Sequence, residues 1–402
     1  MKASILTIGD ELLAGITLDS NAAWIGRKLM DLGIKTVHKL TVPDDETEIA
    51  EAFKISQGKG DITICTGGLG PTKDDITLKS FCEYTGSELQ FDDYYYDRLK
   101  KEFERRGYKI SETNRNQAFV PDKGQIIPNP KGTARGVQFE KNGKTLFILP
   151  GVPGEMKTMM EETILPYLES LDKEDYHVIN LRTTGLMESA LYEMVSDLVE
   201  NSEMDIAFIP GFTGVDIRLT TMDETELFEL VDALYDRIGN YIYAENWDSL
   251  EKAVGLVLSQ ESLTIAVAES CTGGLLADRI TNNPGSSNYF FGGAVTYSNE
   301  SKMDFLGVKK ATLEKDGAVS SEVAEQMAKG VRKKFKSDIG VGITGIAGPT
   351  GGSKEKPVGL TFIGLDVNGE SKVKKAVFTN DRRYNKELAV QSALNLVRVA
   401  LL

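Results

Sequence analysis

The sequence predicts an α/β protein with two three-layer α/β domains, whose sheets are mostly parallel, joined by a small α+β module. Short apolar segments alternate with segments of helical periodicity at both ends of the chain, which favours parallel strands covered by helices on both faces. A glycine-rich segment follows an apolar strand in each half, where open α/β sheets bind ligands. The 402 residues accommodate two to three domains, which we place at residues 1–171, 172–248 and 249–402.

The first domain begins with an apolar strand at residues 4–8, which runs into Gly9-Asp10-Glu11. Residues 21–32 carry apolar side chains at helical spacing. Asn142-Gly143 is a strong hairpin-turn signal. The other elements that we expect here are a buried strand at 61–65, a helix at 92–106, hairpin strands at 137–140 and 144–149, and a helix at 155–168.

The middle module has a β-α-β-β-α pattern. Its expected strands lie at 178–184, 206–210 and 215–221, and its expected helices at 189–199 and 224–238. The segment 211–214, GFTG, has the GxxG pattern with which KH modules clamp RNA, so the module is KH-like. Because this segment joins two strands and has no basic flank, we interpret it as a hairpin turn.

The last domain returns to strand–helix alternation. Its expected strands lie at 263–268, 293–297, 339–344, 359–365 and 372–378. A first helix is expected to begin at Asp248-Ser249, and three more are expected at 274–280, 321–334 and 384–401. The two α/β halves share no visible repeat, so we expect two independent sites.

The composition excludes several classes of function. A net charge of −14 opposes binding to phosphate backbones, so we expect no direct nucleic-acid contact. No uninterrupted apolar run reaches the ~18 residues of a membrane span, and no signal peptide is visible. The three cysteines form no CxxC motif. These three observations predict a soluble cytoplasmic protein. With only His38 and His177 available, hydrolysis calls for a histidine-free mechanism or a metal held by carboxylates.

A candidate phosphate site follows the strand at 61–65. Gly67, Gly68 and Gly70 permit positive φ and close approach of the backbone, so successive N–H groups can bind an anion. We expect Thr72 to cap the following helix and add its positive end. The segment is neither a Walker loop nor GxGxxG, and a purely structural strand–helix turn is the alternative.

Several carboxylates are predicted to lie at the ends of neighbouring strands. Their negative charges would repel a phosphate bound at the glycine-rich segment unless a cation binds between them. Glu11, Asp44, Asp74 and Asp75 are the candidate ligands of a divalent metal, Mg²⁺ or similar. Mg²⁺ commonly bridges one or two carboxylates and substrate phosphates, so the set predicts metal-assisted pyrophosphate chemistry. Each of these acids taken alone also fits a solvated loop or a helix cap.

A candidate nucleophile lies in AESCTGG, at a predicted strand-to-helix elbow. Ser270 is that nucleophile, and the N–H groups of Gly273 and Gly274 are candidate oxyanion donors. No histidine lies in this half, so Lys302 is the candidate base of a serine–lysine pair, provided that its pKa is lowered. Tyr297 could relay the proton or orient the pair. Taken alone, the serine also fits a helix cap and the lysine a surface position.

A second glycine-rich run, TGIAGPTGG, follows the strand at 339–344 and begins with Thr344 and Gly345. It offers backbone donors at another strand end, and Lys356 and Arg382 are cations that could meet a phosphate. An ordinary loop is the alternative. Cys271 is a rival nucleophile, but no thiolate-stabilising base accompanies it.

The N-terminal part resembles the CinA family in GDELLAG, SNAAWIGRKL, TGGLGPTKDD, PNPKGTARG and LPGVPGEM. The first domain of that family is similar to molybdopterin-binding domains, where the glycine-rich loop binds phosphate and acids matching Asp44 and Asp75 lie at the active site. The resemblance implies a metal-dependent ADP-ribose pyrophosphatase that yields AMP and ribose 5-phosphate. Arg135 stands where many members have proline.

The C-terminal part resembles the CinA C-terminal domain in AESCTGG, GGAVTYSNESK, GAVS and TGIAGPTGGSKEKPVGL. This resemblance implies deamidation of nicotinamide mononucleotide to nicotinate mononucleotide and ammonia, without a cofactor. It makes Ser270 the nucleophile and Lys302 and Tyr297 its activators, and it adds Thr344 and Arg382 to the site.

Together these features predict a bifunctional nucleotide hydrolase of pyridine-nucleotide salvage, active on ADP-ribose and nicotinamide mononucleotide and assembled as a homodimer. Asn380, where the family pattern has glycine, weakens the match around Arg382. One alternative is a competence or DNA-damage accessory protein that binds a recombination protein. Another is a molybdopterin-binding module with a vestigial C-terminal half, against which the intact serine, tyrosine and lysine set argues.

Overall fold

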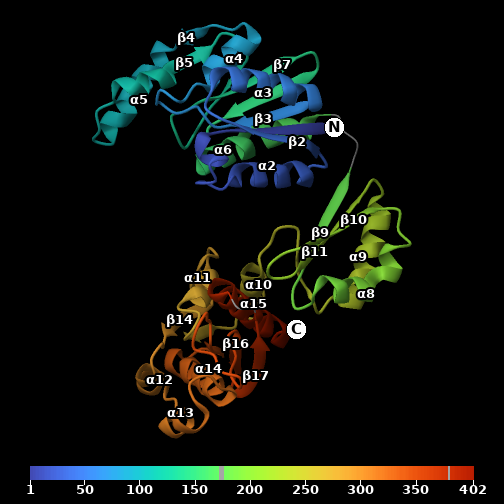
Figure 1. Cartoon of the computed structure of the whole chain (residues 1–402), viewed down its shortest axis with the longest axis vertical. Helices are drawn as coiled ribbons and strands as arrows, with labels where there is room; N and C mark the ends of the chain where they lie inside the picture. Colours follow the sequence, from blue (N-terminus) through green and yellow to red (C-terminus); the bar gives the residue numbers. More distant parts are fainter. Residues whose placement is uncertain (172–175, 379–380) are drawn as a thin grey trace. The chain divides into compact units, whose positions relative to one another are not determined.

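The computed structural model describes residues 1–171, 176–378 and 381–402, which form two compact units, Met1–Val178 and Ile179–Leu402 (Figure 1). The predicted α/β class is confirmed. The expected boundary at residue 172 and the position of Asn380 lie outside the described residues. None of the described helices has the length and apolar character that crossing a membrane requires.

The first unit contains a six-stranded sheet in the order β2-β1-β3-β8-β7-β6. Strands β2, β1, β3 and β8 are parallel, and β7 and β6 are added antiparallel. The bounds are Lys2–Ile8 (β1), Lys35–Val42 (β2), Ile62–Thr66 (β3), Gln125–Ile127 (β6), Gly136–Lys141 (β7) and Lys144–Leu149 (β8). The predicted hairpin turn is confirmed, because Asn142 and Gly143 have φ of 54° and 73°.

Helices cover both faces of this sheet (Figure 1). Side chains alternate along β1, so Ala3 and Ile5 pack with α2 and α6, whereas Leu6 and Ile8 pack with α3 and α4. The helices are α1 (Asp10–Leu13), α2 (Ser20–Asp31), α3 (Glu46–Lys59), α4 (Thr77–Thr85) and α6 (Pro153–Met159), which continues through a π-helix (Met160–Ile164) into α7 (Leu165–Ser170).

A small subdomain extends the first unit between α4 and β6. It contains the two-stranded sheet of β4 (Leu89–Phe91) and β5 (Phe119–Pro121), helix α5 (Asp93–Arg105) and a 3₁₀ helix (Glu112–Ala118). Its own core is small and is built on Tyr95, Leu99 and Ala118. Its strands β4 and β5 were not predicted, because three residues are too few to show a period-2 pattern.

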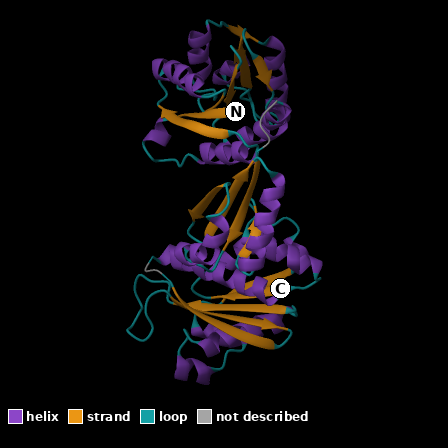
Figure 2. Cartoon of the chain, turned by 90° about the vertical axis from the view of Figure 1, so that its right-hand side faces the viewer, coloured by secondary structure: helices purple, strands orange, loops and turns teal. Residues whose placement is uncertain are grey.

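The second unit contains two sheets (Figure 2). The middle module has the strand order β10-β11-β9-β12, with bounds His177–Thr183 (β9), Asp205–Pro210 (β10), Val215–Thr221 (β11) and Ile242–Glu245 (β12). Helices α8 (Glu188–Val199) and α9 (Glu224–Ile238) pack on it. The GFTG segment joins β10 to β11, and Gly211 N donates to Gly214 O at 2.8 Å, so the predicted hairpin turn is confirmed.

The last domain has a five-stranded sheet in the order β14-β13-β15-β16-β17, in which the first three strands are parallel. The strands are β13 (Ile265–Glu269), β14 (Phe290–Val295), β15 (Ile339–Gly345), β16 (Leu360–Val367) and β17 (Glu370–Val377). The helices are α10 (Leu250–Gln260), α11 (Leu275–Thr281), α12 (Asn299–Leu306), α13 (Lys310–Asp316), α14 (Ser321–Phe335) and α15 (Arg382–Ala400).

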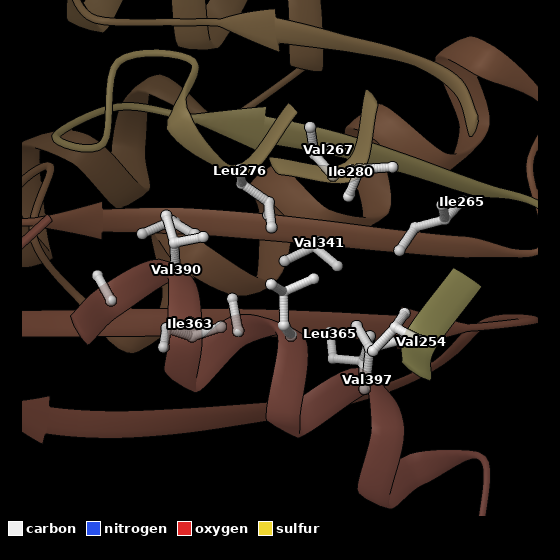
Figure 3. Close-up of a cluster of buried hydrophobic side chains, with 14 of the residues drawn as sticks. Val254, Ile265, Val267, Leu276, Ile280, Val341, Ile363, Leu365, Val390 and Val397 are labelled. Atoms are coloured by element: carbon white, nitrogen blue, oxygen red, sulfur yellow. The ribbon is translucent and has the colours of Figure 1, made fainter. Parts of the chain in front are cut away.

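The main core of this domain lies between the sheet and helices α10, α11 and α15 (Figure 3). Val267, Val341 and Ile363 project from three adjacent strands toward Val254 and Val390 on the helices. The opposite face, with Ala266 and Ala268, packs against α14. Burial on both faces is why β13 is apolar up to Glu269 and β15 is apolar up to Ile343.

Helix α15 also joins the last domain to the middle module. The ring of Tyr384 lies 4.4 Å from that of Phe212 in the GFTG turn. Seven residues on, Gln391 Nε2 donates to Thr184 Oγ1 at 3.3 Å. After seven more, the guanidinium of Arg398 donates to Ile242 O at 2.9 Å and to Asn240 O. The seven-residue spacing places these contacts on one face of the helix.

Candidate functional sites

The glycine-rich loop of the first unit begins directly after β3. Gly67 and Gly68 have φ of 120° and 64°, and a Cβ on Gly67 would lie 2.3 Å from Ile8 O, so both φ and space require glycine there. Among the described residues, the N–H groups of Gly68 and Leu69 have no hydrogen-bond acceptor. These two donors are therefore open to an anion.

The carboxylate of Asp75 closes this loop from the other side. It accepts the N–H groups of Gly70 at 2.7 Å and Thr72 at 2.8 Å, and the Thr72 hydroxyl at 2.6 Å. The predicted capping role of Thr72 is wrong, because its hydroxyl is used inside the loop and α4 begins only at Thr77. Two N–H groups of the predicted phosphate nest thus already hold a carboxylate.

The four acids predicted to bind metal, Glu11, Asp44, Asp74 and Asp75, all line one polar cavity of about 480 Å³ together with the glycine-rich loop. Asp44 accepts the N–H of Asp10 at 3.1 Å. Burial, followed by the neighbouring negative charges, raises the pKa of Asp44 despite that hydrogen bond. A cation would relieve this repulsion.

In the described parts of the chain, no three His, Cys, Asp or Glu side chains are grouped closely enough to hold a metal by themselves. The residues therefore fit a divalent ion only if phosphate oxygens or waters complete its ligands, which is the usual arrangement for Mg²⁺. Asp44 has one oxygen bound to a single backbone N–H, so it is better placed to bind a metal than Asp75, whose two oxygens organise the loop.

The second site is built on a buried pair, Ser270 and Lys302. Ser270 follows β13 at the turn before α11, and Lys302 lies on α12 with only 1% of its surface exposed. The lysine Nζ donates to Ser270 Oγ at 3.1 Å and to the carbonyls of Thr296 at 2.8 Å and Tyr297 at 3.3 Å. Burial lowers the pKa of Lys302, which favours the neutral amine that a general base requires.

Glu269, directly before the nucleophile, holds the elbow in shape. Its buried carboxylate accepts the N–H groups of Gly274, Leu276 and Ala277 at 3.0, 3.1 and 2.9 Å. The N–H of Gly273 donates to Ser270 O at 3.2 Å. The two N–H groups predicted as oxyanion donors, at Gly273 and Gly274, are thus occupied within the elbow.

Two other N–H groups of the elbow donate to no carbonyl oxygen. In the region that the structure describes, these are the N–H groups of Thr272 and of Cys271, the second of which contacts its own thiol sulfur. In α/β-hydrolases, the N–H of the residue after the nucleophilic serine is an oxyanion donor. Burial raises the pKa of the Cys271 thiol to about 11, so it is protonated near neutral pH and a poor nucleophile.

Tyr297 and Arg382 form the outer part of this site. The tyrosine is 61% exposed, and its hydroxyl accepts from Arg382 Nη2 at 3.3 Å, while Arg382 Nη1 donates to Gly348 O at 2.7 Å. Only the backbone carbonyl of Tyr297 contacts Lys302, and the tyrosine hydroxyl contacts Arg382 and not Ser270 or Lys302.

The second glycine-rich run contributes mainly to the framework. Ser270 N donates to Ile343 O at 3.0 Å, which places the adjacent Thr344 and Gly345 beside the elbow. The Thr344 hydroxyl, however, donates to Ala318 O at 2.7 Å. Lys356 Nζ donates to two backbone carbonyls, Asp316 O at 2.6 Å and Val319 O at 2.8 Å, and is thus tied to the framework.

Two residues of this site were missed from the sequence. Glu269 was given no role, although an acid before a nucleophile in a tight turn has unpaired N–H groups within reach. Lys386 lies one helical turn after Arg382, and a Cβ on Gly273 would be 3.7 Å from its Nζ. Its i,i+4 spacing from Arg382 was the available signal, but the last helix was predicted to begin only at residue 384, after the arginine.

Three family models match the chain: a probable molybdopterin binding domain at residues 4–170, the damage-inducible protein CinA KH domain at 180–244, and the CinA C-terminal domain at 247–401. A competence-damage inducible protein of Clostridium novyi is 42% identical over all of this chain and 99% of its own length. The relative from Clostridioides difficile is 40% identical over the same shares.

The chain belongs to the CinA family.

Solved structures of family members include the competence/damage inducible protein of Agrobacterium tumefaciens, 39% identical over 38% of this chain and 93% of its own, with a TM-score of 0.37. The tungsten cofactor synthesizing protein MoaB of Pyrococcus furiosus is 21% identical over 42% of this chain and 97% of its own, with a TM-score of 0.28. For this CinA family member, the KH family model covers the module whose GxxG segment is a hairpin turn.

Proposed function

We propose that this chain is a bifunctional nucleotide hydrolase whose C-terminal site deamidates nicotinamide mononucleotide. The observation that carries the proposal is the 3.1 Å contact between the buried Lys302 Nζ and Ser270 Oγ. A serine needs a base to become a nucleophile, and this amine, with its lowered pKa, is in reach of the hydroxyl proton.

The reaction divides into two halves. Neutral Lys302 takes the proton of Ser270 Oγ, which attacks the carboxamide carbon, and the N–H groups of Cys271 and Thr272 stabilise the resulting oxyanion. The ammonium form of Lys302 returns the proton to the leaving nitrogen as the C–N bond breaks, so ammonia departs and a nicotinoyl ester remains on the serine. Water, deprotonated by the same amine, hydrolyses the ester to nicotinate mononucleotide.

Ammonia release by purified variants tests this mechanism. We expect Ser270→Ala and Lys302→Ala each to lower kcat by at least ~10³-fold, and the double variant to be little worse, because the two residues act as a unit. Cys271→Ala is the matched control and should turn over normally. A dead Cys271→Ala enzyme beside an active Ser270→Ala enzyme would make the cysteine the nucleophile.

The N-terminal site supports a second activity, metal-dependent cleavage of ADP-ribose to AMP and ribose 5-phosphate. The supporting observation is that the acids and the glycine-rich loop line one cavity. Asp44, Glu11 and Asp74 would hold the ion, which when bound polarises the phosphoryl oxygens and activates water. The open N–H groups of Gly68 and Leu69 would bind the pyrophosphate.

Asp75→Ala should abolish ADP-ribose cleavage and leave deamidation intact, because the loop loses the carboxylate that holds Gly70 and Thr72. Asp44→Asn should also stop cleavage, since it removes a metal ligand without touching the loop contacts. AMP formation and ammonia release, assayed on the same preparation, check both. Cleavage that persists in EDTA would refute the metal requirement.

The names of the relatives favour one further candidate, a competence or damage-response protein that acts by binding a partner. Ammonia release by the wild-type protein separates the two, because a pure binding protein releases none.

A further inference from the structure

The GFTG turn of the middle module is fixed against strand β9. Gly211 N donates to Gly214 O at 2.8 Å, which closes the turn. A Cβ on Gly214 would lie 1.8 Å from a carbonyl oxygen of β9, so only glycine lets the turn pack directly on that strand. The hydroxyl of Thr184, at the end of β9, donates to the backbone of the turn at 2.8 Å. The turn therefore holds Phe212, which is 43% exposed, in a defined place.

Phe212 contacts the first turn of helix α15 in the last domain. Its ring lies 4.4 Å from that of Tyr384, at an angle of 33° between the ring planes. Tyr384 N donates to the side chain of Asp381, the residue that caps the helix, at 2.9 Å. The next residue, Asn385, is buried, and its Nδ2 donates to Ala347 O at 3.0 Å. The first turn of α15 is thus held by the middle module as well as by the glycine-rich run of its own domain.

The same helical turn carries two cations of the deamidase site. Arg382 donates to the hydroxyl of Tyr297 at 3.3 Å and to Gly348 O at 2.7 Å. Lys386 lies one turn further along, and a Cβ on Gly273 in the elbow would be 3.7 Å from its Nζ. The place of both cations at the elbow therefore depends on how the first turn of α15 is oriented.

We propose that Phe212 is a positioning residue of the deamidase site, which it reaches through Tyr384 and the first turn of α15. The proposal rests on the deamidase function above. Cations at the rim of the site suit the phosphate of the mononucleotide, whereas the serine and lysine of the buried pair act on its carboxamide. A shift of the first turn of α15 therefore weakens substrate binding and leaves the chemical step unchanged. The GFTG turn thereby has a role within the chain that requires no nucleic acid.

Steady-state ammonia release by the full-length protein tests the proposal. We expect Phe212→Ala to raise the KM for nicotinamide mononucleotide ~3–10-fold, because an aromatic pair stabilises by an amount equal to about that factor in an equilibrium constant. The kcat should stay within about 2-fold of wild type, since the buried pair is untouched. Phe212→Tyr retains the ring and should keep the wild-type KM.

Phe228 provides the matched control. It is a phenylalanine of the same module, 52% exposed, and it lies on α9 instead of the turn. Phe228→Ala should leave both KM and kcat unchanged. An unchanged KM in Phe212→Ala, or the same rise in KM in Phe228→Ala, overturns the proposal.

A double-mutant cycle shows whether Phe212 acts through Arg382. Arg382→Ala should raise KM by itself, and Phe212→Ala added to it should raise KM no further, because the cation that the ring positions is already gone. If the two increases multiply, Phe212 does not act through the arginine and the proposal fails.

Amide hydrogen exchange separates this proposal from the deamidase function, because it needs no substrate. Phe212→Ala should speed exchange in the first turns of α15, at residues 384–388, and Phe228→Ala should not. If exchange responds in this way but wild type releases no ammonia, the positioning of α15 stands and the deamidase function fails. If wild type releases ammonia but exchange in α15 is the same in Phe212→Ala, the function stands and the positioning role fails.

Discussion

In the proposed mechanism, the burial of Lys302 favours reactivity and lowers the stability of the folded state. Its burial lowers the pKa of the amine, so the neutral form needed to deprotonate Ser270 is reached at a lower pH than for a surface lysine. The same burial makes the charged form unfavourable in the folded state, because three hydrogen bonds replace only part of its hydration.

The pH dependence of stability should reveal this cost. A lysine whose pKa is lower in the folded state binds its proton more tightly when unfolded, so its folding penalty is largest below the lowered pKa and vanishes as the pH approaches the ordinary value of about 10.4. We expect wild type to gain stability relative to Lys302→Met over that window, by about 1.4 kcal/mol for each unit of pKa shift. Denaturant unfolding at several pH values measures the difference, and a pH-independent difference would contradict the lowered pKa.

At the scale of single residues, the sequence suggested which residues form the C-terminal site but not which atoms contact one another. Motif resemblance assigned Ser270 and Lys302, which the structure brings to 3.1 Å. It also suggested that Tyr297 acts on this pair, whereas the tyrosine hydroxyl contacts Arg382. Side-chain direction depends on rotamers and on elements distant in sequence, and no local pattern encodes it.

At the scale of elements, the elbow between β13 and α11 depends on Glu269. Three N–H groups of the turn and of the first helical turn have this carboxylate as their acceptor, because no preceding helical turn exists to provide carbonyls. The elbow therefore keeps its shape only while this acid is present.

Glu269→Ala should destabilise the second unit by about 3 kcal/mol, since it leaves the buried N–H of Leu276 and the partly buried N–H groups of Gly274 and Ala277 without their acceptor, and should reduce deamidation at the same time. Glu269→Gln, which retains one carbonyl acceptor, should lose less. Glu300→Ala, an exposed acid in the first turn of α12, is the control and should change stability by less than about 0.5 kcal/mol. Denaturant midpoints give all three values, and a neutral Glu269→Ala would disprove the role of the carboxylate.

The elements with strong local signals were predicted well. Helix α9 was placed at its observed bounds, and the Asn142-Gly143 hairpin was recognised from its turn residues. The start of α4 was misjudged because Asp75 turns back onto the loop and delays the helix to Thr77. Helices α12 and α13, of eight and seven residues, were missed because they are too short to show a clear period.

At the scale of the whole molecule, helix α15 holds the middle module and the last domain together in one compact unit, Ile179–Leu402. The sequence predicted a connecting module at 172–248 but not its contacts with α15, because the partners of α15 lie far away along the chain: Gln391 contacts Thr184, and Arg398 contacts Asn240 and Ile242. Contacts between residues so far apart in the sequence do not affect the local spacing of apolar residues, from which helices and strands are predicted.

The middle module and the last domain should therefore unfold in one calorimetric transition. Arg398→Ala should lower the midpoint of that transition, at a cost of about 2 kcal/mol, because the buried carbonyl of Ile242 and the partly buried carbonyl of Asn240 lose their donor. Arg383→Ala, an exposed arginine on the same helix, should leave it unchanged. Separate melting of the middle module would show that the interface is weak.

The same helix also determines where this chain can be shortened. A shortened protein that starts at Asp248 looks attractive as a compact biocatalyst, since Ser270, Lys302 and their elbow lie beyond that point. Such a truncation would remove the residues of the middle module that contact one face of α15. That face would become exposed to solvent, and exposed interface surfaces favour self-association. Residues 179–247 should therefore be kept, because they cover this face of α15. The alternative is to place charged residues on that face before the chain is shortened.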